Sequence, residues 1–177
     1  MQEILDGGIG LHHIAAASRA FFAWRSIRVS PATDMEAAVI AERVGRGAVH
    51  GRLGQAPFLP LAQTGPTALR GQGPIMDRLS LWLRGAEEAT LSALLHLDRL
   101  ERWQIRAEMD TRDLSGRTPP ALITLLTSWP QITAPFAEAQ IKASRAAIQR
   151  NLQVFVERDL VQEITGQARF RVWTAKL

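Results

Sequence analysis

The sequence predicts a mainly α-helical protein in two parts. A helical N-terminal domain (residues 1–117) is followed by a C-terminal domain (residues 118–177) of three helices and a two-stranded hairpin. Apolar residues recur at helical spacing through much of the chain. The segment Ser115-Gly116-Arg117-Thr118-Pro119-Pro120 interrupts this pattern with a helix stop and a helix start. Near the C-terminus, residues 160–164 and 169–173 have the pattern of two strands joined by a tight turn.

The composition predicts a folded protein that dissolves in water. Of the 177 residues, 46% are hydrophobic and 21% are charged, which is enough for a packed core under a polar surface. The absence of cysteine excludes disulfides, thiolate metal sites and cysteine nucleophiles. The first residues carry acidic groups and no basic stretch, and no apolar run reaches the roughly 18 residues of a membrane span. We therefore expect a cytoplasmic protein.

The N-terminal domain is expected to contain four helices, at residues 11–29, about 31–44, 75–84 and 87–113. Glycine and proline recur between residues 45 and 73, a density that helices do not tolerate, so this stretch predicts a long loop. Such a loop is either a plain connection or the wall of a pocket for a small-molecule effector.

The predicted helix at 87–113 would be about 40 Å long, more than a small domain needs internally. Its apolar residues spread over more than one face. They are Leu91, Leu94, Leu95, Leu97, Leu100, Trp103, Ile105 and Met109. A helix of this kind is either buried within its own chain or shared with a second subunit. We favour a homodimer contact.

The C-terminal domain is predicted to contain helices at 120–129 and 133–140 and a third that begins after Ser144. Thr118, Thr133 and Ser144 are the expected N-caps. Trp129 is expected to face inward from the first helix, and Phe136 and Ala139 from the second. In the third helix the core-facing stripe is Ile148, Leu152, Phe155 and Val156, each worth roughly 1.5–3 kcal/mol on burial before entropy is subtracted.

This rotation of the third helix turns its basic and amide side chains away from the core. Arg145, Gln149, Arg150 and Gln153 then lie outward beside small alanines, as in a helix that enters a DNA major groove. In the second strand, Arg169 and Arg171 are expected on one face and Phe170 and Val172 on the other. Between residues 118 and 177, seven basic residues oppose four acidic ones, a net charge of 7 − 4 = +3. The acidic residues are expected to lie away from the basic face.

The stretch "KASRAAIQRNLQVFVERDLVQEITGQARFRVW" resembles the winged helix-turn-helix family, and together with "SGRTPPALITLL" it is similar to bacterial regulators with a helical N-terminal domain. The resemblance implies sequence-specific binding to double-stranded DNA. It places recognition-helix contacts at Ser144, Arg145, Ala147, Gln149 and Arg150, to which the outward rotation adds Gln153. It places wing contacts at Gln167, Arg169 and Arg171.

The function predicted is transcriptional regulation by a homodimer, without enzymatic activity, metal or cofactor. A similar winged tail closes some Fic-type AMP-transferases, but no histidine here is followed by proline and no Gly-Asn-Gly-Arg occurs. His12 and His13 diverge by about 100° on a helix, so they do not share a metal ion. The alternative function is a winged helix that binds another protein rather than DNA.

Overall fold

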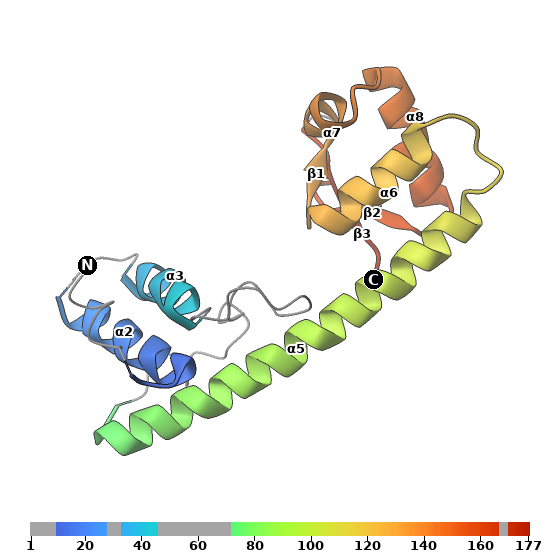
Figure 1. Cartoon of the computed structure of the whole chain (residues 1–177). Helices are drawn as coiled ribbons and strands as arrows, with labels where there is room; N and C mark the ends of the chain where they lie inside the picture. Colours follow the sequence, from blue (N-terminus) through green and yellow to red (C-terminus); the bar gives the residue numbers. More distant parts are fainter. Residues whose placement is uncertain (1–9, 28–32, 46–71, 167–169) are drawn as a thin grey trace. The chain divides into compact units, whose positions relative to one another are not determined.

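The computed structural model describes residues 10–27, 33–45, 72–166 and 170–177. The protein is mainly helical and has a small three-stranded antiparallel sheet (Figure 1). The chain divides into two compact units, Met1–Leu95 and His96–Leu177. The division lies within helix α5 (Ile75–Asp110), so the boundary predicted after Arg117 falls inside the second unit.

The N-terminal unit packs helices α2 (His13–Ile27) and α3 (Thr33–Gly45) against the first turns of α5. Alanines on both helices allow α2 and α3 to approach each other closely. In the core, the centroids of the Phe21 and Trp82 rings lie 5.0 Å apart. The predicted helices at 11–29 and 31–44 correspond to α2 and α3. Residues 46–71, which contain most of the predicted long loop, lie outside the described residues, so the choice between a plain connection and a pocket wall stays a prediction.

Helix α5 corrects the prediction of two helices at 75–84 and 87–113, because it runs unbroken for 36 residues. Gly85 lies in its interior, and one glycine costs only about 1 kcal/mol relative to alanine in a helix. That cost is too small to end a helix that is packed on both sides of the glycine. Although α5 is long, none of the helices in the described parts of the chain is apolar enough to cross a membrane.

The C-terminal unit adds six elements to the end of α5. They are α6 (Thr118–Ser128), β1 (Ile132–Thr133), α7 (Ala134–Ile141), α8 (Arg145–Glu157), β2 (Val161–Glu163) and β3 (Val172–Ala175). All strands are antiparallel in the order β1-β3-β2, and Trp173 of β3 pairs with both Ile132 and Glu163. Strand β1 was not predicted, and β3 begins three residues later than expected.

The core of this unit joins α5 to the last three helices and the sheet. Ile148, Leu152 and Phe155 are fully buried and Val156 is partly buried, so the predicted inward stripe of α8 is confirmed. Trp103 of α5 is also buried there, and its Nε1 donates a hydrogen bond to the Leu160 carbonyl at 2.7 Å. The end of α5 is therefore part of the C-terminal core.

Three smaller predictions in this unit are wrong. Thr118 is not the N-cap of α6, because Thr118 is the first residue of the helix and Arg117 occupies the N-cap position without a side-chain hydrogen bond. Trp129 is 48% exposed because its backbone is extended, which takes its ring off the helical stripe and against Phe136. Ala139 is exposed because Ala137 faces the core, and residues two apart on a helix point about 200° apart.

Candidate nucleic-acid interface

A short turn between α7 and α8 presents the start of α8 to solvent. Lys142 ends α7 in a left-handed conformation with φ 57°, and Ser144 caps α8 by accepting a hydrogen bond from the Ala147 N–H at 3.3 Å. Thr133 caps α7 in the same way, through the Phe136 N–H. Both predicted caps are confirmed. The first turn of α8 thus offers free backbone N–H groups and the positive end of a helix dipole.

Basic and amide side chains occupy the exposed side of α8. Arg145, Gln149, Arg150 and Gln153 are all exposed, whereas Ala147 is half-buried. Gln153 donates to Glu157 Oε1 at 3.0 Å. Arg150 has no hydrogen-bond or ion-pair partner in the described part of the chain. Its guanidinium is therefore available to an external ligand.

Arg145 is bound to an acidic residue, contrary to the expectation that acidic groups lie away from the basic face. Its guanidinium contacts Glu138 Oε2 at 3.0 Å across the turn between α7 and α8. Sequence spacing did not suggest this pair because the two residues lie on different helices. A ligand that binds Arg145 must share this guanidinium with Glu138 or displace the carboxylate.

A groove of about 410 Å³ joins the start of α8 to the beginning of β3. It is lined by Thr133, Ala134, Pro135, Arg145, Gln149, Phe170, Arg171 and Trp173. A second hollow of about 320 Å³ is lined by Gln149, Gln153, Arg171 and Trp173. The fold therefore brings Arg145, Gln149 and Gln153 of the predicted helix residues to one surface with Arg171, whereas Ser144, Ala147 and Arg150 line neither hollow. The start of α7, with Thr133 and Pro135, also lines the groove; the sequence identified Thr133 only as a cap.

The turn after β2 is organised around the carboxylate of Glu163. Its Oε1 accepts hydrogen bonds from the N–H groups of Thr165 and Gly166, each at 2.9 Å, and from the Thr165 hydroxyl. The Thr165 hydroxyl, followed by these N–H groups and Arg171, lowers the pKa of Glu163 below its ordinary value. An acidic residue thus also lies beside Arg171, where none was expected.

The chain before β3 departs from the predicted strand. Phe170 has φ 59°, and Arg171 is exposed just before β3 begins at Val172. The predicted alternation of Phe170 and Arg171 across a strand is therefore wrong, because strand alternation needs extended backbone at both positions. Gln167 and Arg169 lie outside the described residues.

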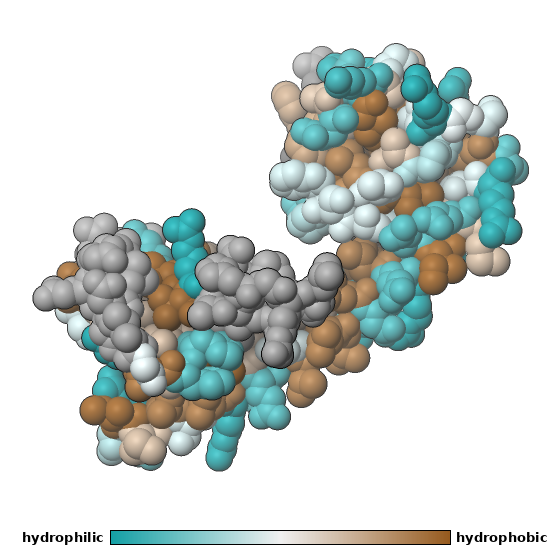
Figure 2. All heavy atoms as spheres, viewed as in Figure 1, coloured by the Kyte–Doolittle hydropathy of each residue, from teal (hydrophilic) through white to brown (hydrophobic). Residues whose placement is uncertain are grey.

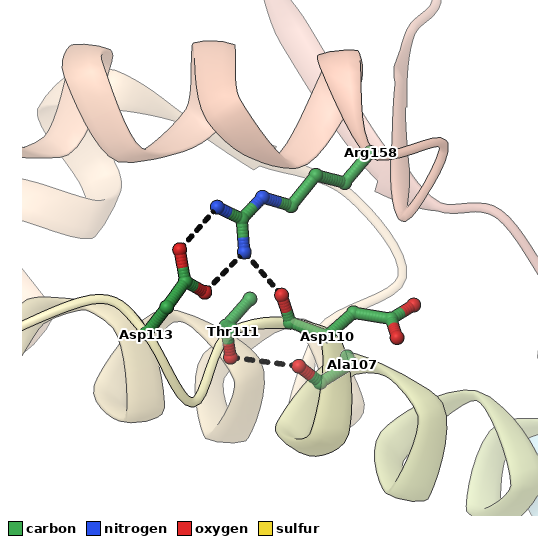
Figure 3. A network of polar contacts seen from close by, with 5 residues as sticks. All are labelled: Ala107, Asp110, Thr111, Asp113 and Arg158. Atoms are coloured by element: carbon green, nitrogen blue, oxygen red, sulfur yellow. Dashed lines mark hydrogen bonds and ion pairs between the residues drawn. The ribbon is translucent and has the colours of Figure 1, made fainter.

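Arg158 fixes the far end of α8 to the turn after α5 (Figure 3). Its two terminal nitrogens donate to the two carboxylate oxygens of Asp113 at 2.6 and 2.7 Å, and one of them also donates to the Asp110 carbonyl. The bidentate contact lowers the pKa of the Asp113 carboxyl. This arginine therefore serves the fold, and its charge does not face the groove.

Replacing Asp113 with Asn is expected to weaken the acid dependence of stability. A carboxyl with a lowered folded-state pKa stabilises the fold above its unfolded-state pKa of about 4, and this contribution is lost as the pH falls through the folded-state pKa. Urea unfolding at a series of pH values below about 5 measures the difference. Arg158→Met should have the same effect, and the double variant should add little to either single change. Additive losses would show that the two residues stabilise the fold independently.

The described residues offer no group of three His, Asp or Glu side chains placed to hold a metal ion. Basic and amide groups, with backbone N–H donors at a capped helix start, are instead suited to an anionic ligand. Comparisons of the chain with protein-family models, with curated proteins and with solved structures found no match.

Proposed function

We propose that the C-terminal unit is a winged helix-turn-helix that binds double-stranded DNA sequence-specifically, and that the protein regulates transcription. The order of elements supports this: three helices, α7 and α8 joined by a tight turn, and a hairpin after the last helix. In this proposal α8 is the recognition helix, and the β2–β3 hairpin is the wing.

The observation that carries the proposal is the groove shared by α8 and the start of β3. Arg145 and Gln149 enter it from the helix, and Arg171 enters it from the hairpin. Arginine and glutamine are the side chains that read guanine and adenine edges in the major groove. We assign base contacts to Arg145, Gln149 and Arg150, and a contact with the phosphate backbone or minor groove to Arg171.

A salt titration of DNA affinity tests the proposal. Each phosphate neutralised releases counterions, so log K is expected to fall with log salt with a slope of about −0.9 per phosphate contacted. The probes are duplexes selected by the protein from a random pool and a scrambled duplex of equal length. Selective binding with a steep slope supports the proposal. Absence of selection, or a slope near zero, contradicts it.

One observation favours the alternative of a protein partner. Phe170 is 87% exposed beside the groove, in a left-handed conformation that is rare for a bulky residue. Exposed aromatic side chains are typical anchors of protein interfaces. If a protein is the ligand, Phe170→Ala should abolish binding of that protein, and DNA affinity should be low and independent of sequence.

A further inference from the structure

Apolar side chains are exposed over the middle of α5 (Figure 2), and a row of large ones continues toward its C-terminal end. Leu91, Leu95, Ile105 and Met109 are between 53% and 60% exposed. The two cores formed by the described residues take other side chains from α5: Trp82 and Ala86 pack in the N-terminal core, and Trp103 and Ala107 pack in the C-terminal core. Water contact on this much apolar surface is unfavourable, at roughly 25 cal/mol per Å².

The row has the spacing of a coiled-coil seam. The positions Leu91, Leu95, Asp98, Arg102, Ile105 and Met109 are separated alternately by four and three residues. Separations that alternate between four and three residues average 3.5 residues, the period with which helices pair in a coiled coil. The two central positions are charged, and Arg102 donates to Asp98 within the same helix. The seam is therefore two apolar layers, a charged centre and two further apolar layers.

We propose that α5 pairs with α5 of a second copy of this chain, in antiparallel register centred on Leu100. In that register Leu91 meets Met109 of the other copy, and Leu95 meets Ile105. The register also places Asp98 of each copy beside Arg102 of the other copy, so that two acidic and two basic groups meet at the two-fold axis.

Charge complementarity selects this arrangement over the parallel one. Parallel, in-register pairing would set Asp98 against Asp98 and Arg102 against Arg102, and like charges across a seam are destabilising. The antiparallel pairing also satisfies an isologous two-fold interface, in which the same surface of each copy meets itself. The inference does not depend on DNA binding, and its test contains no DNA.

Sedimentation velocity over a range of protein concentrations measures the pairing. The full chain is expected to dimerise, and Leu95→Glu is expected to weaken the dimer roughly tenfold or more, because a charge then enters an apolar layer. Leu97→Glu is the matched control: Leu97 is 59% exposed against 60% for Leu95, but it lies off the seam. A monomer at every concentration, or equal effects of the two variants, would overturn the proposal.

Charge and cysteine variants test the register. Asp98→Arg should dissociate the dimer and Asp98→Arg with Arg102→Asp should restore it. The chain has no cysteine, so introduced ones can be oxidised cleanly. Leu91→Cys combined with Met109→Cys should yield a disulfide-linked dimer, whereas neither single variant should, since positions 91 and 109 of one helix lie about 27 Å apart. Crosslinking by both single variants would show parallel pairing and reject the antiparallel register.

Discussion

Trp103→Ala is expected to destabilise the C-terminal unit by about 3–5 kcal/mol. The change removes a fully buried indole from the core and also the hydrogen bond from its Nε1 to the Leu160 carbonyl. Hydrogen exchange of the full chain measures the loss for this unit alone. Ile148 and Leu152 lie in the buried stripe of α8. Where global unfolding of the unit controls exchange, the protection factors of their backbone amides should fall by a factor of about 10²–10⁴.

Trp103→Phe is the matched control for this variant. It keeps an aromatic ring in the core but cannot donate to Leu160, whose carbonyl still accepts the Lys176 N–H at 3.0 Å. Its cost is therefore expected to be smaller, about 1–2 kcal/mol. The comparison also tests the extent of the unit. If the C-terminal domain began at residue 118, Trp103→Ala would leave the exchange of the α8 amides unchanged, and that result would contradict the packing of α5 described above.

Arg150→Ala is expected to weaken binding to the selected DNA by about 1–3 kcal/mol, the contribution of a good bidentate base contact. Arg150 suits this role because its guanidinium is exposed on α8 and has no partner in the described residues to compete with DNA. Fluorescence anisotropy at one fixed salt concentration, with the selected and the scrambled duplex, measures the change. The loss should appear on the selected duplex and be much smaller on the scrambled one.

Arg117→Ala removes the same charge from the same unit, at an exposed position before α6. It is expected to change affinity for both duplexes little and equally. Equal losses on the two duplexes for Arg150→Ala would identify Arg150 as a phosphate contact. No loss on either duplex would remove α8 from the proposed interface.

The local signals in the sequence predicted most of the elements that carry the candidate interface. Ser144 and Thr133 cap α8 and α7 as expected, because capping is a contact between residues three apart in the chain. The stripe of Ile148, Leu152 and Phe155 predicted the rotation of α8 correctly. Burying these three large side chains stabilises this rotation of the helix more than any other rotation. The outward position of Gln149 and Arg150 followed from that rotation.

Several of the errors arose where separate elements of the fold meet. Strand β1 has two residues, too few for a pattern, and it exists because Ile132 pairs with Trp173. The contact of Glu138 with Arg145 depends on how α7 and α8 cross, which periodicity within one helix does not specify. The prediction that one helix ends at residue 84 and another begins at 87 was wrong, because packing on both sides holds α5 together across this position.

By itself the sequence determined much of what depends on neighbours along the chain: most of the helices, the caps of α7 and α8, the inward face of α8 and the absence of thiol chemistry. The tertiary structure alone decided what depends on contacts across the fold. It assigned the end of α5 to the C-terminal core, brought Arg171 to the groove beside Gln149, and bound Arg145 to Glu138. The physical reason is that helix formation and capping are short-range interactions, whereas packing and ion pairing act between surfaces that only the folded chain brings together.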